Sequence, residues 1–438
     1  MNDAPVRLLH ADDVHFDSEL ARLRSTTAET ASGIETQVAD IIDQVRREGD
    51  RALLRLTARW DRLQISASGL AFSDDEIDQA IRRCDSEDIR ALELAARRIR
   101  DYHLWQLPPL GRQTFTDGDG TLLGQRLRPL DRVGLYVPGG LASYPSSVLM
   151  NALPAKVTGV GELVMTVPTP DGQFNPLLLA AARIAGVDEI YRIGGAQAIA
   201  ALAFGTATIA PVDKIVGPGN IYVATAKRQV FGHVGIDMIA GPSEIVIIAD
   251  GDNPPEWLAA DLLSQAEHDA SASAILLTDH PALATAVATA LGQHLARLER
   301  NAICRQSLRD HGAIIITRSL EEACRIASRL APEHLELAVA DPERYVDRID
   351  HAGAIFLGRM TPEAMGDYIA GPNHVLPTSR TARFSSPLGV YDFLKRSSII
   401  GCTPASLAAM GPAASRLARA EGLTAHQLSI DLRLESLR

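Results

Sequence analysis

The middle of the chain alternates between two kinds of segment, and this alternation restricts the possible folds more than any other feature. Short runs rich in Val, Ile and Leu have the length of buried strands, at 133–137, 163–167, 190–193, 214–216, 245–249, 274–278 and 313–317. Ala-rich stretches typical of helices fall between most of them, at 175–185, 196–204, 220–231, 254–268 and 282–298. This order predicts an α/β fold with two largely parallel sheets. Ligands in such sheets bind at the carboxyl ends of the strands, so we expect the functional side chains there.

The two ends of the chain have a different pattern. Apolar residues between 34 and 45 recur every three or four positions, which is the spacing of one helix face. Three acidic residues at 74–76 are typical of a helix start, because the helix dipole favours negative charge there. After about residue 389 the pattern becomes helical again. We therefore expect helical segments before and after the α/β part of the chain.

Composition excludes several classes of protein. The 438 residues include 43 Lys+Arg and 54 Asp+Glu, a net charge of −11 that makes nucleic acid an unlikely main partner. No segment approaches the roughly 20 apolar residues that span a bilayer, so no membrane is expected. The four cysteines form no C-x-x-C pair, which argues against a zinc ribbon or a disulfide framework. With no secretory signal at the N-terminus, a cytoplasmic protein is expected.

Three glycine turns each follow a predicted strand, at 139–140, 194–195 and 217–219. Glycine at a strand-to-helix turn lets a phosphate approach the backbone N–H groups at the start of the helix. None of the turns is a complete G-x-G-x-x-G fingerprint, and each is also explained as a tight turn. Because each has a polar side chain close by (Tyr136, Gln197 and Asn220), the three together favour a nucleotide site.

Two short motifs have the residue types of a metal or acid–base site. Gln265 and His268 are three positions apart, so on a helix they share one face and could ligate zinc, although a solvated helix end also fits. Glu333 and His334 follow a helix and precede an apolar run, and in a loop both could reach one cavity. His transfers protons near neutral pH and Glu can activate water. A helix cap with a surface His is the alternative.

Other acids and imidazoles lie near the C-terminal end. Asp367 and His374 belong to a Gly- and Pro-rich polar segment, and Glu421 and His426 follow further along. The sequence has no G-x-S-x-G elbow, Walker A loop or H-E-x-x-H motif. The residues by themselves predict an α/β enzyme and leave its substrate, nucleotide and metal open.

Several longer motifs occur in one order along the chain. They are VGLYVPGG at 133–140, YPSSVLMNALPAK at 144–156, GGAQAIAALAFG at 194–205, KIVGPGN at 214–220, DMIAGPSE at 237–244, LSQAEH at 263–268, APEHL at 331–335, GDY at 366–368, NHVLPT at 373–378, DFLKR at 392–396 and EGLTAH at 421–426. In order and spacing this set resembles the histidinol dehydrogenase family. The resemblance covers about residues 34–426, whereas the first 30 residues match weakly. Ala370–Pro372 and Ser379–Arg380 differ from the family pattern without touching the matched positions.

The resemblance implies an NAD-dependent, zinc-requiring homodimer. Its expected reaction is the four-electron oxidation of L-histidinol through L-histidinaldehyde to L-histidine, which ends histidine biosynthesis. The implied fold has two incomplete Rossmann-like domains with parallel sheets, a helical N-terminal arm and a small helical C-terminal domain. The expected boundaries are 1–30 for the arm, 31–140 with 241–388 for the domain with zinc and catalytic residues, 141–240 for the NAD domain and 389–438 for a dimerisation segment.

The resemblance also implies residue roles. Zinc would be held by Gln265, His268, Asp367 and His426. The substrate would meet these four residues together with Ser243, His334, His374 and Glu421. NAD would contact Tyr136, Gln197 and Asn220. His334 would act as the general base and Glu333 would activate water, while Glu421 and His426 would come from the second subunit.

Three alternatives stay open at this point. A related zinc- and NAD-dependent dehydrogenase of another small polyol, such as a sulfonated diol, would share nearly all these motifs. A non-catalytic binding protein could have kept the fold, although the full set of ligands, base and acid argues against it. A zinc hydrolase using Glu333 would leave the three glycine turns without a purpose.

Overall fold

The computed structural model describes residues 6–24, 32–139 and 144–438, so Gly140 of the first glycine turn lies outside the described residues. The chain forms two compact units. The first contains 1–106 and 131–392, and the second contains 107–130 and 393–438. Within the described residues, no helix combines the length and apolar character needed to cross a membrane.

A six-stranded parallel sheet forms one half of the first unit, in the order β1-β11-β10-β9-β12-β13. Its strands are β1 (Arg7–His10), β9 (Glu244–Ala249), β10 (Ser273–Thr278), β11 (Ala313–Ile316), β12 (His334–Ala338) and β13 (Ala354–Leu357). Its helices are α1 (Phe16–Arg24), α10 (Pro255–Ala266), α11 (Pro281–Leu295), α12 (Asn301–His311), α13 (Leu320–Leu330), α14 (Glu343–Val346) and α15 (Glu363–Tyr368).

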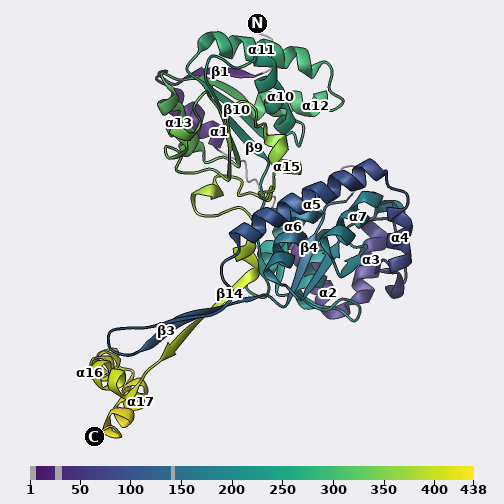
Figure 1. The fold of residues 1–438 in the computed structure, drawn as a ribbon. Helices are drawn as coiled ribbons and strands as arrows, with labels where there is room; N and C mark the ends of the chain where they lie inside the picture. The colour runs from purple at the N-terminus through teal and green to yellow at the C-terminus, as the bar shows by residue number, and fades with distance from the viewer. Residues whose placement is uncertain (1–5, 25–31, 140–143) are drawn as a thin grey trace. The chain divides into compact units, whose positions relative to one another are not determined.

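Helices cover both faces of this sheet (Figure 1). Side chains alternate between the faces along β9, because successive residues of a strand point to opposite sides. Ile245 and Ile247 pack in one cluster with α10, α11 and α12. Val246 and Ile248 pack in the other with α1 and α13. The near-continuous apolar strands therefore reflect burial on both faces.

A five-stranded parallel sheet forms the other half of the first unit, in the order β6-β5-β4-β7-β8. Its strands are β4 (Arg132–Tyr136), β5 (Glu162–Thr166), β6 (Glu189–Tyr191), β7 (Lys214–Val216) and β8 (Gly235–Ile236). Its helices are α2 (Ser32–Glu48), α3 (Asp50–Trp60), α4 (Asp74–Ile81), α5 (Ser86–Gln106), α6 (Pro145–Thr158), α7 (Pro176–Ala185), α8 (Gly195–Phe204) and α9 (Ile221–Val230). Single turns of 3₁₀ helix are η1 (Ala67–Gly69), η2 (Pro170–Gly172), η3 (Thr381–Arg383) and η4 (Val390–Phe393).

The second unit joins an antiparallel ribbon to a helix pair (Figure 1). The ribbon has the order β14-β3-β2. Its strands are β2 (Gly111–Thr116), β3 (Leu122–Pro129) and β14 (Leu394–Gly401), and the helices are α16 (Pro404–Ala420) and α17 (Thr424–Glu435). The ribbon was not predicted, because its strands are largely exposed and have no continuous apolar face.

The α/β fold with two parallel sheets is confirmed, and all seven predicted strands are present. The grouping of the chain differs from the expected boundaries. Strand β1, placed in an N-terminal arm, pairs with β11 of the six-stranded sheet. Strand β4, placed with the first domain, pairs with β5 and β7 of the other sheet. These groupings depend on strand pairing between distant segments, which local patterns do not encode.

Candidate active site

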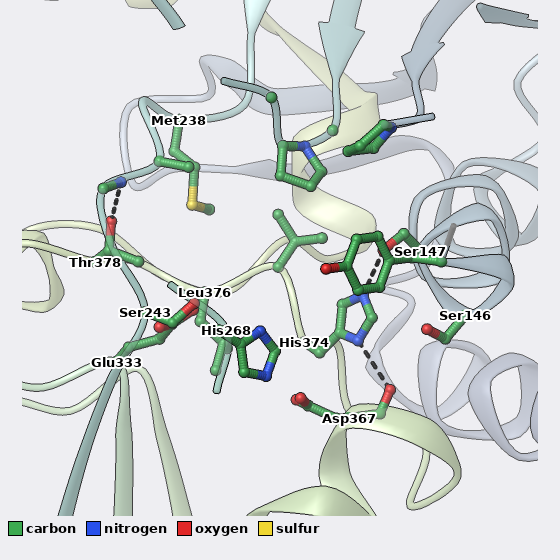
Figure 2. A pocket seen from close by; sticks show the side chains of 18 of the residues that line it. Ser146, Ser147, Met238, Ser243, His268, Glu333, Asp367, His374, Leu376 and Thr378 are labelled. Atoms are coloured by element: carbon green, nitrogen blue, oxygen red, sulfur yellow. Dashed lines mark hydrogen bonds between the residues drawn. The ribbon is translucent and has the colours of Figure 1, made fainter. Parts of the chain in front are cut away.

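A cavity of about 290 Å³ in the first unit brings together most of the expected site residues. The expected residues in its lining are Asn220, Ser243, Gln265, His268, Glu333, His334, Asp367 and His374. Figure 2 shows Glu333, His268, Asp367 and His374 around the same space. The expected residues in the lining, from Asn220 to His374, span more than 150 positions of the chain, so only the tertiary structure joins them.

The position of the cavity corrects one expectation. Ser243 immediately precedes β9, and Glu333 and His334 lie at the start of β12. The catalytic candidates therefore lie at the amino ends of the six-stranded sheet, and not at its carboxyl ends. In the five-stranded sheet the cavity is lined by Gly217 and Asp237, which follow β7 and β8, as expected for carboxyl ends.

His334 is the first residue of β12, whereas a loop position was expected. It pairs in register with Ile245 of β9 and Ala354 of β13, so it lies inside the sheet and is 3% exposed. Its Nδ1 lies 3.1 Å from the carbonyl oxygen of Glu244. In the neutral form of the ring, donation from Nδ1 to this carbonyl leaves Nε2 without a proton. Within the described part of the chain, Nε2 has no hydrogen-bond partner.

Three carboxylates surround the His334 ring. Its Nε2 lies 3.6 Å from Asp367 Oδ1 and 3.7 Å from Glu363 Oε1, and its Nδ1 lies 3.7 Å from Glu333 Oε2. Burial lowers the pKa of His334, but these negative neighbours outweigh burial and raise it to about 10. A cation bound beside the ring would oppose this increase.

Glu333 is buried with 7% of its surface exposed. The backbone N–H of Glu244 donates to its Oε2 at 2.9 Å, which fixes the carboxyl group at the edge of β9. Burial raises the pKa of this carboxyl to about 8. A carboxyl group with a pKa near neutrality can both take up and release a proton under ordinary conditions.

Gln265 and His268 lie at the end of α10, but they do not share one helix face as expected. The helix ends at Ala266, and His268 follows in a turn in which its N–H donates to the carbonyl of Gln265 at 3.2 Å. Gln265 is fully buried and His268 is exposed. Both still line the cavity, because the chain turns back toward β10 at this point.

Glu363, on the short helix α15, was missed by the sequence analysis. It lies four residues before Asp367, so the two carboxyl groups share a helix face. Glu363 is 2% exposed, and burial raises its pKa to about 7. With the Gln265 amide turned to satisfy both its ends, Nε2 donates to the two Glu363 oxygens at 2.8 and 3.1 Å. The pattern of two acids four positions apart was a signal that could have identified it.

Asp367 and His374 form the opposite wall of the cavity (Figure 2). His374 Nδ1 lies 2.8 Å from the backbone carbonyl of Asp367, and its Nε2 lies 3.3 Å from the Ser147 hydroxyl. Desolvation lowers the pKa of His374. Desolvation would raise the pKa of Asp367, but His334 and the other nearby imidazoles outweigh it, and the pKa is lowered.

The three residues expected to contact NAD are not together in this cavity. Asn220 lines it and is exposed, with its side-chain oxygen capping α9 through the N–H groups of Tyr222 and Val223. Tyr136, at the carboxyl end of β4, is 4% exposed, and its hydroxyl accepts from the Gly195 N–H at 3.1 Å. Burial raises the pKa of Tyr136 to about 12. Gln197 is buried in α8.

Glu421 and His426 belong to the second unit. Glu421 is the C-cap of α16, and His426 lies in the first turn of α17. Both side chains are exposed.

The chain is similar to known proteins over nearly its whole length. The family model of histidinol dehydrogenase matches residues 24–434. Histidinol dehydrogenase of Rhodospirillum rubrum is 60% identical over 431 residues, which cover 98% of this chain and 99% of the relative. That of Cereibacter sphaeroides is 60% identical over 422 residues, which cover 96% of this chain and 97% of the relative. The crystal structure of histidinol dehydrogenase from Elizabethkingia anophelis has a TM-score of 0.94 at 35% identity, with both chains covered completely. The chain therefore belongs to the histidinol dehydrogenase family, oxidoreductases of histidine biosynthesis.

Proposed function

We propose that this chain oxidises L-histidinol through L-histidinaldehyde to L-histidine with two molecules of NAD. An alcohol loses four electrons when it becomes an acid, and each NAD accepts two of them as a hydride. One observation carries the proposal: a buried Glu–His pair faces the same cavity as Gln265, His268 and Asp367. Another polyol as substrate is not favoured, because the relatives described above are named histidinol dehydrogenases.

His334 has the geometry of the general base. Because its Nδ1 is held by the Glu244 carbonyl, Nε2 is the atom left to accept a proton, and a zinc ion bound nearby would lower the raised pKa of the ring so that Nε2 is unprotonated. It would accept the alcohol proton in the first step and assist again in the second. Strand pairing on both sides of β12 holds the ring in place, so little reorganisation is needed when the substrate binds.

Glu333 would activate the water that attacks the aldehyde. Its carboxyl group lies beside the His334 ring, with Oε2 3.7 Å from Nδ1. The pKa of about 8 that burial gives it suits proton abstraction from water better than that of an exposed glutamate. In a closed cavity the aldehyde would stay bound between the two steps and would not be lost to the solvent.

The residues present fit a zinc ion. Gln265, His268 and Asp367 supply oxygen and imidazole nitrogen, which zinc accepts, and all three line the cavity. Ligand atoms of His334, Glu363 and Asp367 lie within 4.8 Å of one another, so the negative charge is concentrated at one point. With the Gln265 nitrogen toward Glu363, its oxygen accepts from the Glu244 N–H at 2.9 Å and has a second lone pair that zinc could use. Bound there, zinc would hold the imidazole and amino nitrogens of the substrate.

The remaining expected roles complete the proposal. Ser243 and His374 line the cavity and would contact the substrate. We propose a homodimer in which a second copy supplies His426 as the fourth zinc ligand and Glu421 as a substrate contact. Tyr136, Gln197 and Asn220 would contact NAD at the carboxyl edge of the five-stranded sheet.

Product stoichiometry tests the proposal. Purified protein with zinc and excess NAD is given a limiting amount of L-histidinol, and NADH and histidine are measured at completion. We expect two NADH per histidine, and loss of activity after chelation. Glu333→Gln should slow the oxidation of added L-histidinaldehyde far more than the first oxidation of L-histidinol. A folded, zinc-loaded protein that leaves histidinol unchanged would refute the assignment.

A further inference from the structure

A buried ion pair lies beside the proposed NAD region. Lys227 of α9 pairs with Asp237, the residue that follows β8, and their side chains are 3% and 1% exposed. Among the described residues, no other lysine or arginine forms an ion pair in which both side chains are less than 5% exposed. Both residues line the cavity of the active site. The proposed mechanism assigns neither of them a role.

The pair holds both backbone polar groups of a single glycine. The N–H of Gly217 donates to Asp237 Oδ2 at 2.8 Å, and Lys227 Nζ donates to the carbonyl of Gly217 at 2.9 Å. With the Lys227–Asp237 contact, these bonds close a ring around Gly217. Three elements, β7, β8 and α9, are thereby fixed to one another at this point.

Gly217 has no space for a side chain on the side that faces Tyr136. Its φ is +112°, and a Cβ atom built on it would lie 2.1 Å from the carbonyl oxygen of Tyr136. It therefore packs directly against the end of β4. On its other side it leads through Pro218 and Gly219 to Asn220, which caps α9 in the cavity wall. Gly217 thus connects two of the three residues proposed to contact NAD.

Stability alone does not explain such a pair. Taking two charges out of water is costly, and replacing a buried ion pair by apolar residues of similar volume is often neutral or stabilising. Apolar residues could fill this space, but they could not bond to the N–H and carbonyl of Gly217. The specific contribution of the pair is the position of the 217–220 turn.

We infer that Lys227 and Asp237 are positioning residues for NAD, because they hold Gly217 and the Asn220 turn in the form that accepts the dinucleotide. The inference rests on the proposed NAD role of this edge of the sheet. Neither residue touches the His334, Glu333 and Asp367 group in any hydrogen bond or ion pair of the described chain. Their removal should therefore affect NAD and leave histidinol and zinc unaffected.

The test is the double variant Lys227→Met/Asp237→Leu. We expect the KM for NAD to rise at least tenfold, while kcat, the KM for histidinol and the zinc content stay within twofold of the parent protein. Hydrogen exchange in the 214–223 segment should become faster, because the Gly217 N–H loses its acceptor. An unchanged KM for NAD in a folded variant would overturn the inference, as would an equal rise in both Michaelis constants.

The chain offers a control in a more exposed ion pair, with side chains 28% and 43% exposed. Lys156 and Asp188 also form an ion pair at the five-stranded sheet, at 2.8 Å, and Asp188 also accepts a backbone N–H, that of Leu163, at 2.7 Å. Neither residue lines the cavity of the active site. Lys156→Met/Asp188→Leu should leave the KM for NAD unchanged. A rise equal to that of the first variant would show a general loss of structure and count against the positioning role.

A second variant covers the case in which the apolar pair does not fold. Lys227→Gln/Asp237→Asn keeps polar groups of similar size but removes the charges. We expect a smaller rise in the KM for NAD, about threefold, and no change in the KM for histidinol. An unchanged KM for NAD, or an equal rise in the two Michaelis constants, overturns the inference. If the parent protein fails to oxidise histidinol, the proposed function fails by itself. NAD affinities from calorimetry on the same variants then decide the positioning role.

Discussion

Glu363 should determine zinc affinity although the resemblance assigned it no ligand role. It is 2% exposed, and in the satisfied orientation the Gln265 amide donates to both of its oxygens. The hydroxyl of Ser264 donates to Oε2 at 3.3 Å. The Glu363 carboxyl group therefore fixes the orientation of Gln265, a proposed zinc ligand. The perturbations are Glu363→Gln, which keeps the shape but removes the charge, and Glu363→Ala, which leaves the Gln265 amide without this acceptor.

The expected magnitude follows from these contacts. Partners that orient a metal ligand typically contribute about 10–100-fold in metal affinity, which corresponds to roughly 1.4–2.8 kcal/mol. An unpaired buried amide donor costs about 1–3 kcal/mol, which is the same range. We therefore expect the Kd for zinc to rise about tenfold in Glu363→Gln and toward a hundredfold in Glu363→Ala.

Competition with a zinc-binding dye measures these constants, and Glu87→Gln, whose side chain is 86% exposed on α5, is the control. An unchanged Kd combined with a lower Tm of the metal-free protein would refute the reasoning and leave Glu363 a structural role only. A loss well beyond a hundredfold in Glu363→Gln would instead show that Glu363 is itself a ligand.

Three further predictions concern pH, packing and metal loading. Burial raises the pKa of Asp61 to about 6, so the folded state binds more protons than the unfolded state between about pH 4 and 6 and loses stability as pH rises through that range. Asp61→Asn should raise the free energy of unfolding, measured by urea titration, by roughly 1–2 kcal/mol at pH 8, after allowance for solvent screening. At pH 4 the same substitution should change the free energy of unfolding little. A Cβ on Gly353 would lie 2.5 Å from the carbonyl oxygen of Glu333 and would displace this residue. Gly353→Ala should therefore lower kcat about tenfold or more and leave NAD affinity unchanged. An unaltered kcat would contradict this prediction. Zinc binding at pH 7 should release protons, because the metal-free protein keeps the pKa of His334 at about 10 and that of Glu363 at about 7. Calorimetry in two buffers of different ionisation enthalpy should then give different apparent binding enthalpies. Equal binding enthalpies would argue against proton release.

The local pattern was enough to predict the elements of the α/β part. Apolar runs of strand length and Ala-rich helical stretches indicated both parallel sheets, because burial on two faces leaves a continuous apolar strand. The same pattern failed for β2, β3 and β14, whose exposed strands carry no such signal. It also placed His334 in a loop, although the apolar run that follows His334 is the rest of β12.

The identity of most cavity residues was also available from the sequence, because motif order and spacing resemble one family. Glu363 and the Lys227–Asp237 pair were not identified, because neither the four-position spacing of Glu363 from Asp367 nor the place of Asp237 at the start of the 237–244 motif gives a role by itself. Their importance comes from contacts with Gln265 and with Gly217.

The sequence by itself thus determined the candidate residue types and the helices and strands of the α/β part, because both follow from short-range spacing. Only the tertiary structure decided that the amino end of β12 and the end of α10 meet at one cavity, and that β1 joins β11. The physical reason is that parallel strands pair across long stretches of chain, and the choice of partner depends on how all the buried faces pack together. A cavity built at such junctions is therefore a property of the packed fold and cannot be read from any one segment.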